Sequence, residues 1–268
     1  MTVSITGLGQ KEADFLAKLS QRGDIIFTTR QAQEFWGKPA LAWQVLNRLQ
    51  RKGWIQRLER GLYMIVPLEA GPERHWTEDS FVIAGHLTQP AAIAYWSALH
   101  YWNMTEHIPQ VILVQSTARK HKAQALILGV AYRFILITES KFFGVITQYR
   151  NGQPFPITDR EKTLIDACDR PDLSGGIALV SRALKTSLDQ LDWERLDDYL
   201  ARFGSSAVYK RLGYLIELGE LAIPEREKRL EHWRAKLKSG ISPLEPGAGT
   251  TGRINSRWRL RVNVEVNP

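Results

Sequence analysis

The sequence predicts a mixed α+β protein with two domains, and three observations lead to this expectation. Its 268 residues exceed the roughly 100 to 200 residues that one domain usually contains. Hydrophobic residues make up 44% and charged residues 24%, which is ordinary globular usage and allows a real core. Apolar residues recur at helical spacing near both ends of the chain, whereas β-branched and aromatic runs lie between residues 111 and 149.

The N-terminal elements follow from spacing and from helix-boundary residues. Residues 10–20 carry apolar side chains at helical spacing before Gly23, and residues 25–27 form a short strand-like run. Thr28 or Thr29 is a suitable N-cap for a second helix that Gly37 ends. A third helix is expected from Pro39 up to Gly53, with an apolar stripe made of Leu41, Ala42, Val45, Leu46 and Leu49.

A hairpin follows this third helix. Residues 54–58 and 62–66 are expected to be strands, joined by a turn over residues 59–61 and closed by Pro67. Helix, short strand, helix, turn, helix and two-stranded ribbon is the order of a winged helix-turn-helix. The stretch VLNRLQRKGWIQRLERGLYMI resembles that family. The first domain is therefore placed at residues 1–68.

The third helix has a face suited to DNA. Opposite its apolar stripe it carries Gln44, Asn47, Arg48 and Arg51, which have the donors and acceptors that read base edges in the major groove. Residues 28–61 contain seven bases and two acids, a net charge of +5 out of +8 for the whole chain. This concentration favours an anionic partner, and a solvated face is the alternative.

A polar linker is expected at residues 69–78, followed by an α+β domain at residues 79–268. Helices are expected at residues 81–87 and 90–102, and strands at residues 111–114, 129–138 and 142–149. Further helices are expected at residues 161–168 and 176–187, and a helical end spans residues 190–237.

The C-terminal segment alternates apolar and polar residues from Trp258 to Val266, which predicts a half-buried strand that returns to a sheet of the second domain. Residues 239–252 before it are rich in Gly, Pro, Ser and Thr and read as a connector. Residues 247–252 match G-x-G-x-x-G, but they follow Glu245-Pro246 rather than a strand, so no dinucleotide is expected.

The remaining composition limits location and membrane contact. A pI near 9.6 is compatible with nucleic acid or a membrane surface, but the apolar runs at residues 91–99 and 123–138 are shorter than the roughly 20 residues of a membrane span. The single Cys168 cannot form an internal disulfide, and the first 15 residues lack a signal-peptide pattern. A cytoplasmic protein without a membrane partner is expected.

No catalytic, metal or cofactor site is predicted. There is no phosphate-binding P-loop motif, and one cysteine and six dispersed histidines show no zinc spacing. Asp159, Glu161 and Asp166 resemble the carboxylates of Mg²⁺-dependent nucleases, which makes a winged-helix-targeted nuclease one alternative. Acids that complement a helix N-terminus explain Asp159 and Glu161 more simply.

The second domain leaves another alternative open. Residues 151–200 hold ten acids and six bases, a net charge of −4, which is unfavourable for DNA. A protein-interaction module that docks a basic partner is therefore the third hypothesis, beside a repressor and a nuclease.

With both halves assembled, the chain resembles the AbiEi-type antitoxins of type IV toxin-antitoxin systems, which are predicted transcriptional regulators of viral defence. The resemblance rests on four segments of the sequence. These are RKGWIQRLERGLYMI, PAAIAYWSALHYWNMTEHIPQVILV, PITDREKTLIDACDRPDLSGGIALVSRAL and RINSRWRLRVNV.

The resemblance implies a non-enzymatic repressor that binds double-stranded operator DNA at inverted repeats and autoregulates its operon. It also implies a C-terminal domain that antagonises a nucleotidyltransferase-like toxin, with direct binding left open. On this sequence, the residues facing the major groove would be Lys38, Trp43, Gln44, Asn47 and Arg48. Those on phosphates or in the minor groove would be Arg51, Arg57 and Arg60.

Overall fold

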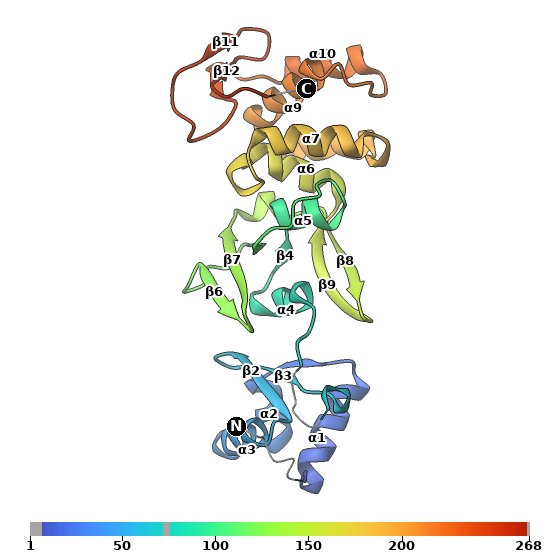
Figure 1. Ribbon diagram of the computed structural model, residues 1–268, viewed down its shortest axis with the longest axis vertical. Coiled ribbons are helices and arrows are strands. Elements are labelled where there is room, and N and C mark those ends of the chain that lie inside the picture. The colour runs from blue at the N-terminus through green and yellow to red at the C-terminus, as the bar shows by residue number, and fades with distance from the viewer. Residues whose placement is uncertain (1–6, 72–75, 267–268) are drawn as a thin grey trace.

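The computed structural model describes residues 7–71 and 76–266 and shows an elongated molecule built in layers along its long axis (Figure 1). A small helical region with a three-stranded sheet lies at one end, a six-stranded sheet lies in the middle, and a pile of helices with a second small sheet lies at the other end. The predicted α+β class, with a winged helix before a mixed domain, is confirmed. The domain boundaries at residues 68 and 79 stay a prediction, because residues 72–75 of the expected linker lie outside the described residues.

The N-terminal region has the element order that the sequence predicts. Its elements are α1 (Gln10–Gln21), β1 (Ile26–Thr28), α2 (Thr29–Trp36), α3 (Pro39–Arg51), β2 (Ile55–Glu59) and β3 (Leu62–Ile65). The three strands pair antiparallel in the order β1-β3-β2, and η1 (Leu68–Ala70) follows them.

Local signals set the limits of α2 and α3. The Thr28 hydroxyl accepts the Gln31 N–H at 3.3 Å, while the Gln31 side chain accepts the Thr28 N–H at 2.7 Å. This reciprocal cap satisfies two of the donors that a helix start leaves free. Gly37, at φ 69°, ends α2 in the left-handed conformation, and Pro39 begins α3.

The apolar stripe of α3 is narrower than predicted. Ala42, Val45, Leu46 and Leu49 are buried, but Leu41 is 41% exposed. At about 100° per residue, Leu41 lies roughly 90° from the centre of the stripe that the other four residues form, so it sits at the edge of the apolar face. The buried side chains of α3 pack with Phe15, Phe27 and other residues of a separate N-terminal core.

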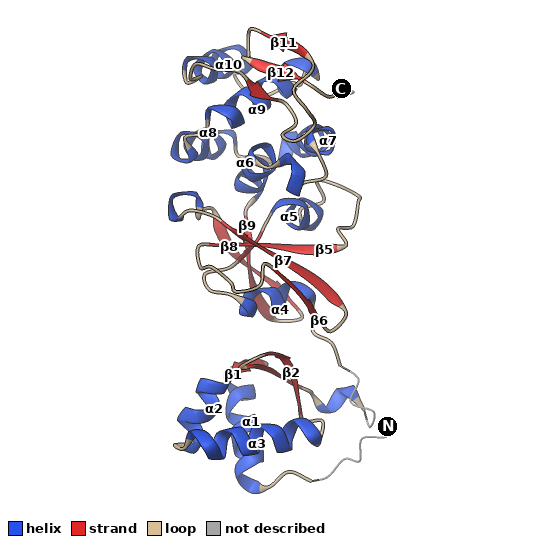
Figure 2. Ribbon diagram, turned by 90° about the vertical axis from the view of Figure 1, so that its left-hand side faces the viewer, coloured by secondary structure: helices blue, strands red, loops and turns tan. Residues whose placement is uncertain are grey.

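One face of the sheet β1-β3-β2 lies toward the N-terminal helices, and its opposite face lies toward the six-stranded sheet in the middle of the molecule (Figure 2). Ile26, Leu58, Leu62 and Met64 belong to the large core that continues into the middle sheet. Helix α3 lies on the far side of this region, away from the middle sheet (Figure 1). The arrangement therefore leaves the outer face of α3 at the end of the molecule.

The middle sheet is mixed, with strand order β6-β7-β5-β4-β9-β8. Its strands are β4 (Ala92–Ile93), β5 (Val111–Ser116), β6 (Gln124–Ile127), β7 (Val130–Leu136), β8 (Val145–Arg150) and β9 (Gln153–Thr158). Helix α4 (Ser80–Leu87) covers one face, and α5 (Tyr95–Tyr101) lies on the other (Figure 2).

One expectation for this sheet was only partly right, and two of its strands were missed. The helix predicted over residues 90–102 is a strand, β4, followed by the shorter α5. An apolar run buried on both faces of a sheet has no alternation, so its spacing cannot distinguish it from a helix. Strands β6 and β9 were not predicted, and β9 contains Pro154 and Pro156, which sequence reasoning treats as strand breakers.

The helical layer contains α6 (Arg160–Asp169), α7 (Ile177–Ser187), α8 (Trp193–Phe203), α9 (Ser206–Leu218) and α10 (Arg226–Ala235). Three short turns, η2 (Glu139–Lys141), η3 (Pro171–Leu173) and η4 (Leu188–Gln190), connect elements around it. Gly213 of α9 is in close contact with the ring of Trp258, which fixes the C-terminal segment on this helix: a Cβ there would lie 2.1 Å from the ring.

The C-terminal strand is shorter than the alternating pattern predicts. Strand β12 (Leu260–Val262) pairs with β10 (Ser242–Pro243) and β11 (Arg253–Asn255) in a separate small sheet, not in the six-stranded one. Residues 247–252 form the loop before β11 and open no helix.

Candidate nucleic-acid interface

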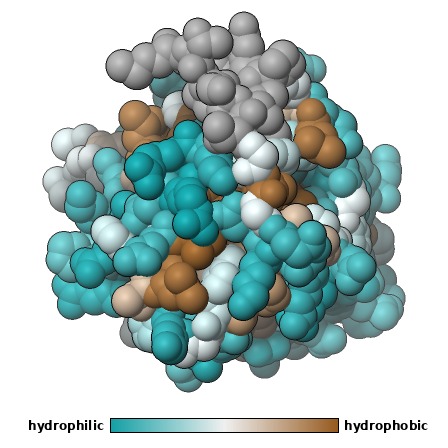
Figure 3. Space-filling model, turned by 90° about the horizontal axis from the view of Figure 1, so that it is seen from below, coloured by the Kyte–Doolittle hydropathy of each residue, from teal (hydrophilic) through white to brown (hydrophobic). Residues whose placement is uncertain are grey.

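The outer face of α3 carries a hollow lined by polar and basic side chains. Figure 3 views the molecule from this end, where the surface is mostly hydrophilic with separate apolar patches. The hollow is lined by Trp43, Gln44, Asn47, Arg48, Gln50, Arg51 and Arg57. Six of these are predicted site residues, and Gln50 was missed although it lies three residues after Asn47 on the same helix face.

The exposed residues of α3 retain free hydrogen-bonding groups. Trp43 is 64% exposed, and Gln44 is exposed beside it. Asn47 is half-buried, and its side-chain nitrogen donates to the Trp43 carbonyl at 2.9 Å, which holds the amide in place. The Asn47 oxygen and the Gln44 amide remain available to base edges.

Glu12 of α1 positions Arg48 of α3 and Lys52, the residue that follows this helix. Arg48 Nε donates to Glu12 Oε1 at 2.5 Å, and Lys52 Nζ lies 3.3 Å from Glu12 Oε2. Burial acts to raise the pKa of Glu12, but the Gly9 N–H, Arg48 and Lys52 together outweigh it and hold that pKa below its ordinary value. The charged Glu12 therefore holds the guanidinium of Arg48 through Nε, while the side chain stays 49% exposed.

The hairpin contributes one predicted residue to the hollow and places the other elsewhere. Arg57 of β2 lines the hollow, and its Nε donates to the Glu59 carbonyl at 3.2 Å. Arg60 is exposed in the turn between β2 and β3 and does not line the hollow. Lys38 is exposed at the N-cap of α3, also outside the hollow.

The turn of the hairpin is tied to its surroundings. The Gly61 carbonyl accepts the Thr29 N–H at 2.8 Å. Lys120, in the segment before β6, donates to both carboxylate oxygens of Glu59 at 2.9 Å. The wing, which is the hairpin β2–β3 with its turn, is therefore held between α2 and the segment that precedes β6.

The carboxylates of α6 have structural partners. Asp159 caps the helix by accepting the Lys162 N–H at 2.9 Å and also accepts the Tyr199 hydroxyl. Glu161 accepts the Asp192 N–H at 2.8 Å, and Asp166 pairs with the buried Lys162. Across the described residues, no group of three or more His, Cys, Asp or Glu is arranged to hold a metal ion.

Two further predictions concern Cys168 and the membrane. Cys168 is fully buried in the core, and burial raises the pKa of its thiol to about 12. Among the helices of residues 7–71 and 76–266, none is long and apolar enough to cross a membrane.

Comparisons with known proteins agree with the N-terminal assignment. Residues 14–66 match the model of a family described as "Transcriptional regulator, AbiEi antitoxin". This match confirms the predicted resemblance over the region that contains α3 and the hairpin. In this region the chain has the sequence pattern of a family of DNA-binding transcriptional regulators that serve as antitoxins.

The whole chain is similar in fold to a solved structure. The crystal structure of the RV2827C protein from Mycobacterium tuberculosis superposes with a TM-score of 0.61 at 15% identity, covering 96% of this chain and 93% of that one. At this identity the likeness concerns the fold. The search of curated proteins gave no match.

Proposed function

We propose that the chain is a cytoplasmic repressor and antitoxin that binds operator DNA through the outer face of α3. The observation that carries the proposal is the hollow where Gln44, Asn47 and Arg48 lie together on a helix whose residues match the regulator family. Gln and Asn can pair with adenine and Arg with guanine in the major groove.

The surrounding bases would set the affinity. Arg51 and Arg57 line the same hollow and would contact phosphates, while Lys38 and Arg60, exposed outside it, would reach the flanking backbone. Contacts to phosphates fix the protein on the duplex, whereas contacts to base edges give it specificity. With about four phosphates neutralised by these bases, log affinity should fall with log salt at a slope of roughly −3.5 to −4.

The first test is a gel-shift titration with the DNA upstream of the protein's own gene, using shuffled DNA of equal length as competitor. The Gln44→Ala/Arg48→Ala variant should lose the preference for the upstream DNA while keeping its unfolding midpoint. The matched control is Arg182→Ala/Gln190→Ala, which changes exposed residues of the same types on α7 and η4. Equal loss in both variants, or unchanged affinity in the first, would contradict the assignment of α3.

Autoregulation and the antitoxin role need separate measurements. One α3 reads one half-site, so inverted repeats require two copies of the chain on the operator. We propose that the C-terminal domain antagonises a nucleotidyltransferase-like toxin encoded beside it. Coexpression that rescues growth, together with a pull-down of the neighbouring product, would separate direct capture from indirect antagonism.

A further inference from the structure

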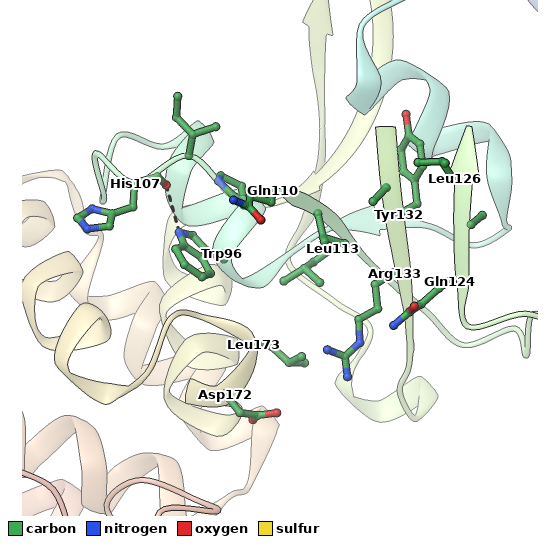
Figure 4. Close-up of a pocket in the computed structure, with 15 residues that line it drawn as sticks. Trp96, His107, Gln110, Leu113, Gln124, Leu126, Tyr132, Arg133, Asp172 and Leu173 are labelled. Carbon is green, nitrogen blue, oxygen red and sulfur yellow. Dashed lines mark hydrogen bonds between the residues drawn. The ribbon is translucent and has the colours of Figure 1, made fainter. Parts of the chain in front are cut away.

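A cavity of about 780 Å³ lies on the middle sheet at its β6–β7–β5 end (Figure 4). It opens on the face opposite α4, because the Tyr132 hydroxyl of β7 donates to the Ser80 carbonyl of α4 and the next residue, Arg133, points the other way. Leu126 is paired with Ala131, and Leu113 with Arg133, so these four side chains lie on the face of the sheet that bears the cavity.

The walls of the cavity come from elements far apart in the sequence. Trp96 of α5 forms one wall, and its ring nitrogen donates to the His107 carbonyl at 3.1 Å, which holds the loop before β5 in place. Leu173 of η3 forms another wall. At the rim, Ile108 is 76% exposed and Leu126 is 75% exposed, so large apolar side chains surround the opening without cover.

One end of the cavity carries an excess positive charge. Figure 4 shows the guanidinium of Arg133 extending over the floor toward Leu113 and Leu173. Among the described residues this guanidinium has no hydrogen-bond or ion-pair partner, although its positive charge helps to lower the pKa of Asp172. Asp172 nearby is already held by Arg170 through two hydrogen bonds of 2.9 and 2.8 Å. Arg170, beside the cavity, is thus the main partner of Asp172, and Arg133 acts on it only at longer range, so these three groups together carry one net positive charge.

We propose that this cavity binds a small organic acid with a flat apolar body and a single negative charge. The apolar floor and the indole of Trp96 suit a ring system, and the free fork of Arg133 matches a carboxylate in two parallel hydrogen bonds. The volume lies within the range of about 300 to 1,000 Å³ that is typical of small-ligand sites. One residual charge favours a monoanion over a phosphate dianion.

The site is separate from the proposed DNA interface. Its residues belong to α5, η3 and the middle sheet, whereas the hollow on α3 lies at the end of the N-terminal region. The organic-acid proposal can therefore fail while the repressor proposal holds, and the reverse is also true.

The test uses the full chain and the fluorescent monoanion 8-anilinonaphthalene-1-sulfonate. Wild type should bind one equivalent saturably, and Arg133→Gln should weaken binding about tenfold or more, because a charge-assisted bidentate contact is lost. Ala131→Trp, which fills the floor, should abolish binding. Arg182→Gln, an exposed arginine on α7, is the matched control and should bind as wild type does.

Displacement then defines the chemistry of the ligand. 1-Naphthoate should displace the dye about tenfold more effectively than neutral 1-naphthamide, and also better than 1-naphthyl phosphate. The proposal is overturned if Arg133→Gln and Arg182→Gln respond alike, if the amide competes as well as the acid, or if the phosphate competes best. A dimer in light scattering that Leu126→Gln dissolves would assign the face to a second copy and equally overturn it.

Discussion

Two buried carboxylates, Glu12 in the N-terminal region and Asp166 in the helical layer, both pair with bases, but their pKa values are shifted in opposite directions. Burial raises the pKa of Asp166 to about 6 although Lys162 opposes the shift. Burial also acts on Glu12, but its three donors together lower the pKa. A carboxylate deep in the core with one basic partner is thus shifted toward its neutral form, whereas one nearer the surface with three donors is held in its charged form.

The bases of the two pairs differ as well. The Lys162 side chain is fully buried and lies near the rings of Phe143 and Phe203. Arg48 and Lys52, which share Glu12, have side chains that are 49% and 22% exposed. The pair in α6 is therefore part of the core, whereas the group around Glu12 holds bases at the surface proposed to meet DNA.

The largest expected effect comes from Asp166→Ala. It leaves the ammonium of Lys162 buried without its partner, which should lower the free energy of unfolding by about 3–5 kcal/mol. Urea unfolding followed by circular dichroism measures this change. The double variant Lys162→Met/Asp166→Leu should recover most of the loss, since it removes both charges. A loss below about 1 kcal/mol in the single variant would show that Lys162 finds water or another acceptor.

The pH dependence of stability should separate the two carboxylates. The pKa of Asp166 is higher in the folded chain than in the unfolded chain, so protonation of this carboxyl stabilises the fold. This contribution to the free energy of unfolding, up to roughly 3 kcal/mol, is fully present below about pH 4 and is lost as the pH rises through about 6. The pKa of Glu12 is lower in the folded chain, so its contribution is present above about pH 4.5 and is lost as the pH falls.

Unfolding midpoints from pH 3 to pH 8 provide the measurement. Asp166→Asn should remove the decrease between about pH 4 and pH 6, and Glu12→Gln should reduce the decrease below about pH 4.5. If both variants retain the wild-type profile, other groups determine the pH dependence and the comparison fails.

Sequence reasoning succeeded where the signal was local. The Thr28 cap, Gly37 and Pro39 mark the limits of α2 and α3 within a few residues of chain. Helical spacing places Gln44, Asn47, Arg48 and Arg51 on one face of α3, and these residues line the hollow. Their contact with DNA stays a prediction. These features depend on neighbours in the sequence.

Features that depend on distant partners could not be read in the same way. Glu12 contacts Arg48 from 36 residues away, and no spacing rule connects the two. Strand β4 has two residues and exists because β5 and β9 pair with it on both sides. Lys38 and Arg60 lie outside the hollow. Their positions depend on how the start of α3 and the hairpin pack in three dimensions, and the number of basic residues in the sequence does not predict this packing.

Glu12→Gln should have a smaller effect on stability and a distinct effect on DNA. Losing the carboxylate weakens the contacts to Arg48 and Lys52, which should cost about 1–2 kcal/mol of unfolding free energy because the bases are partly solvated. The same change removes one negative charge beside α3, so affinity for shuffled DNA at low salt should rise about two- to fivefold. Gel-shift titration and urea unfolding on one preparation test both effects. A lower free energy of unfolding together with a lower affinity for shuffled DNA would contradict this interpretation.

The smallest expected effect concerns Glu59 and Lys120, a third pair that joins the wing to the middle sheet. Their side chains are 32% and 16% exposed, and Lys120 Nζ also lies 4.4 Å from the ring centroid of Phe134. Lys120→Met keeps the apolar stem and removes the charge, so it should lower the free energy of unfolding by only about 0.5–1 kcal/mol.

Hydrogen exchange locates the effect of Lys120→Met. Amides of residues 58–62 should exchange faster, while those of α3 keep their wild-type rates, because the core of α3 is separate from this contact. Operator affinity should stay within about twofold of wild type, since Gln44, Asn47 and Arg48 do not contact the pair. A tenfold loss of affinity would instead mean that the contact between Glu59 and Lys120 positions the hairpin for DNA binding. This partly exposed pair would then matter more for DNA affinity than the group around Glu12.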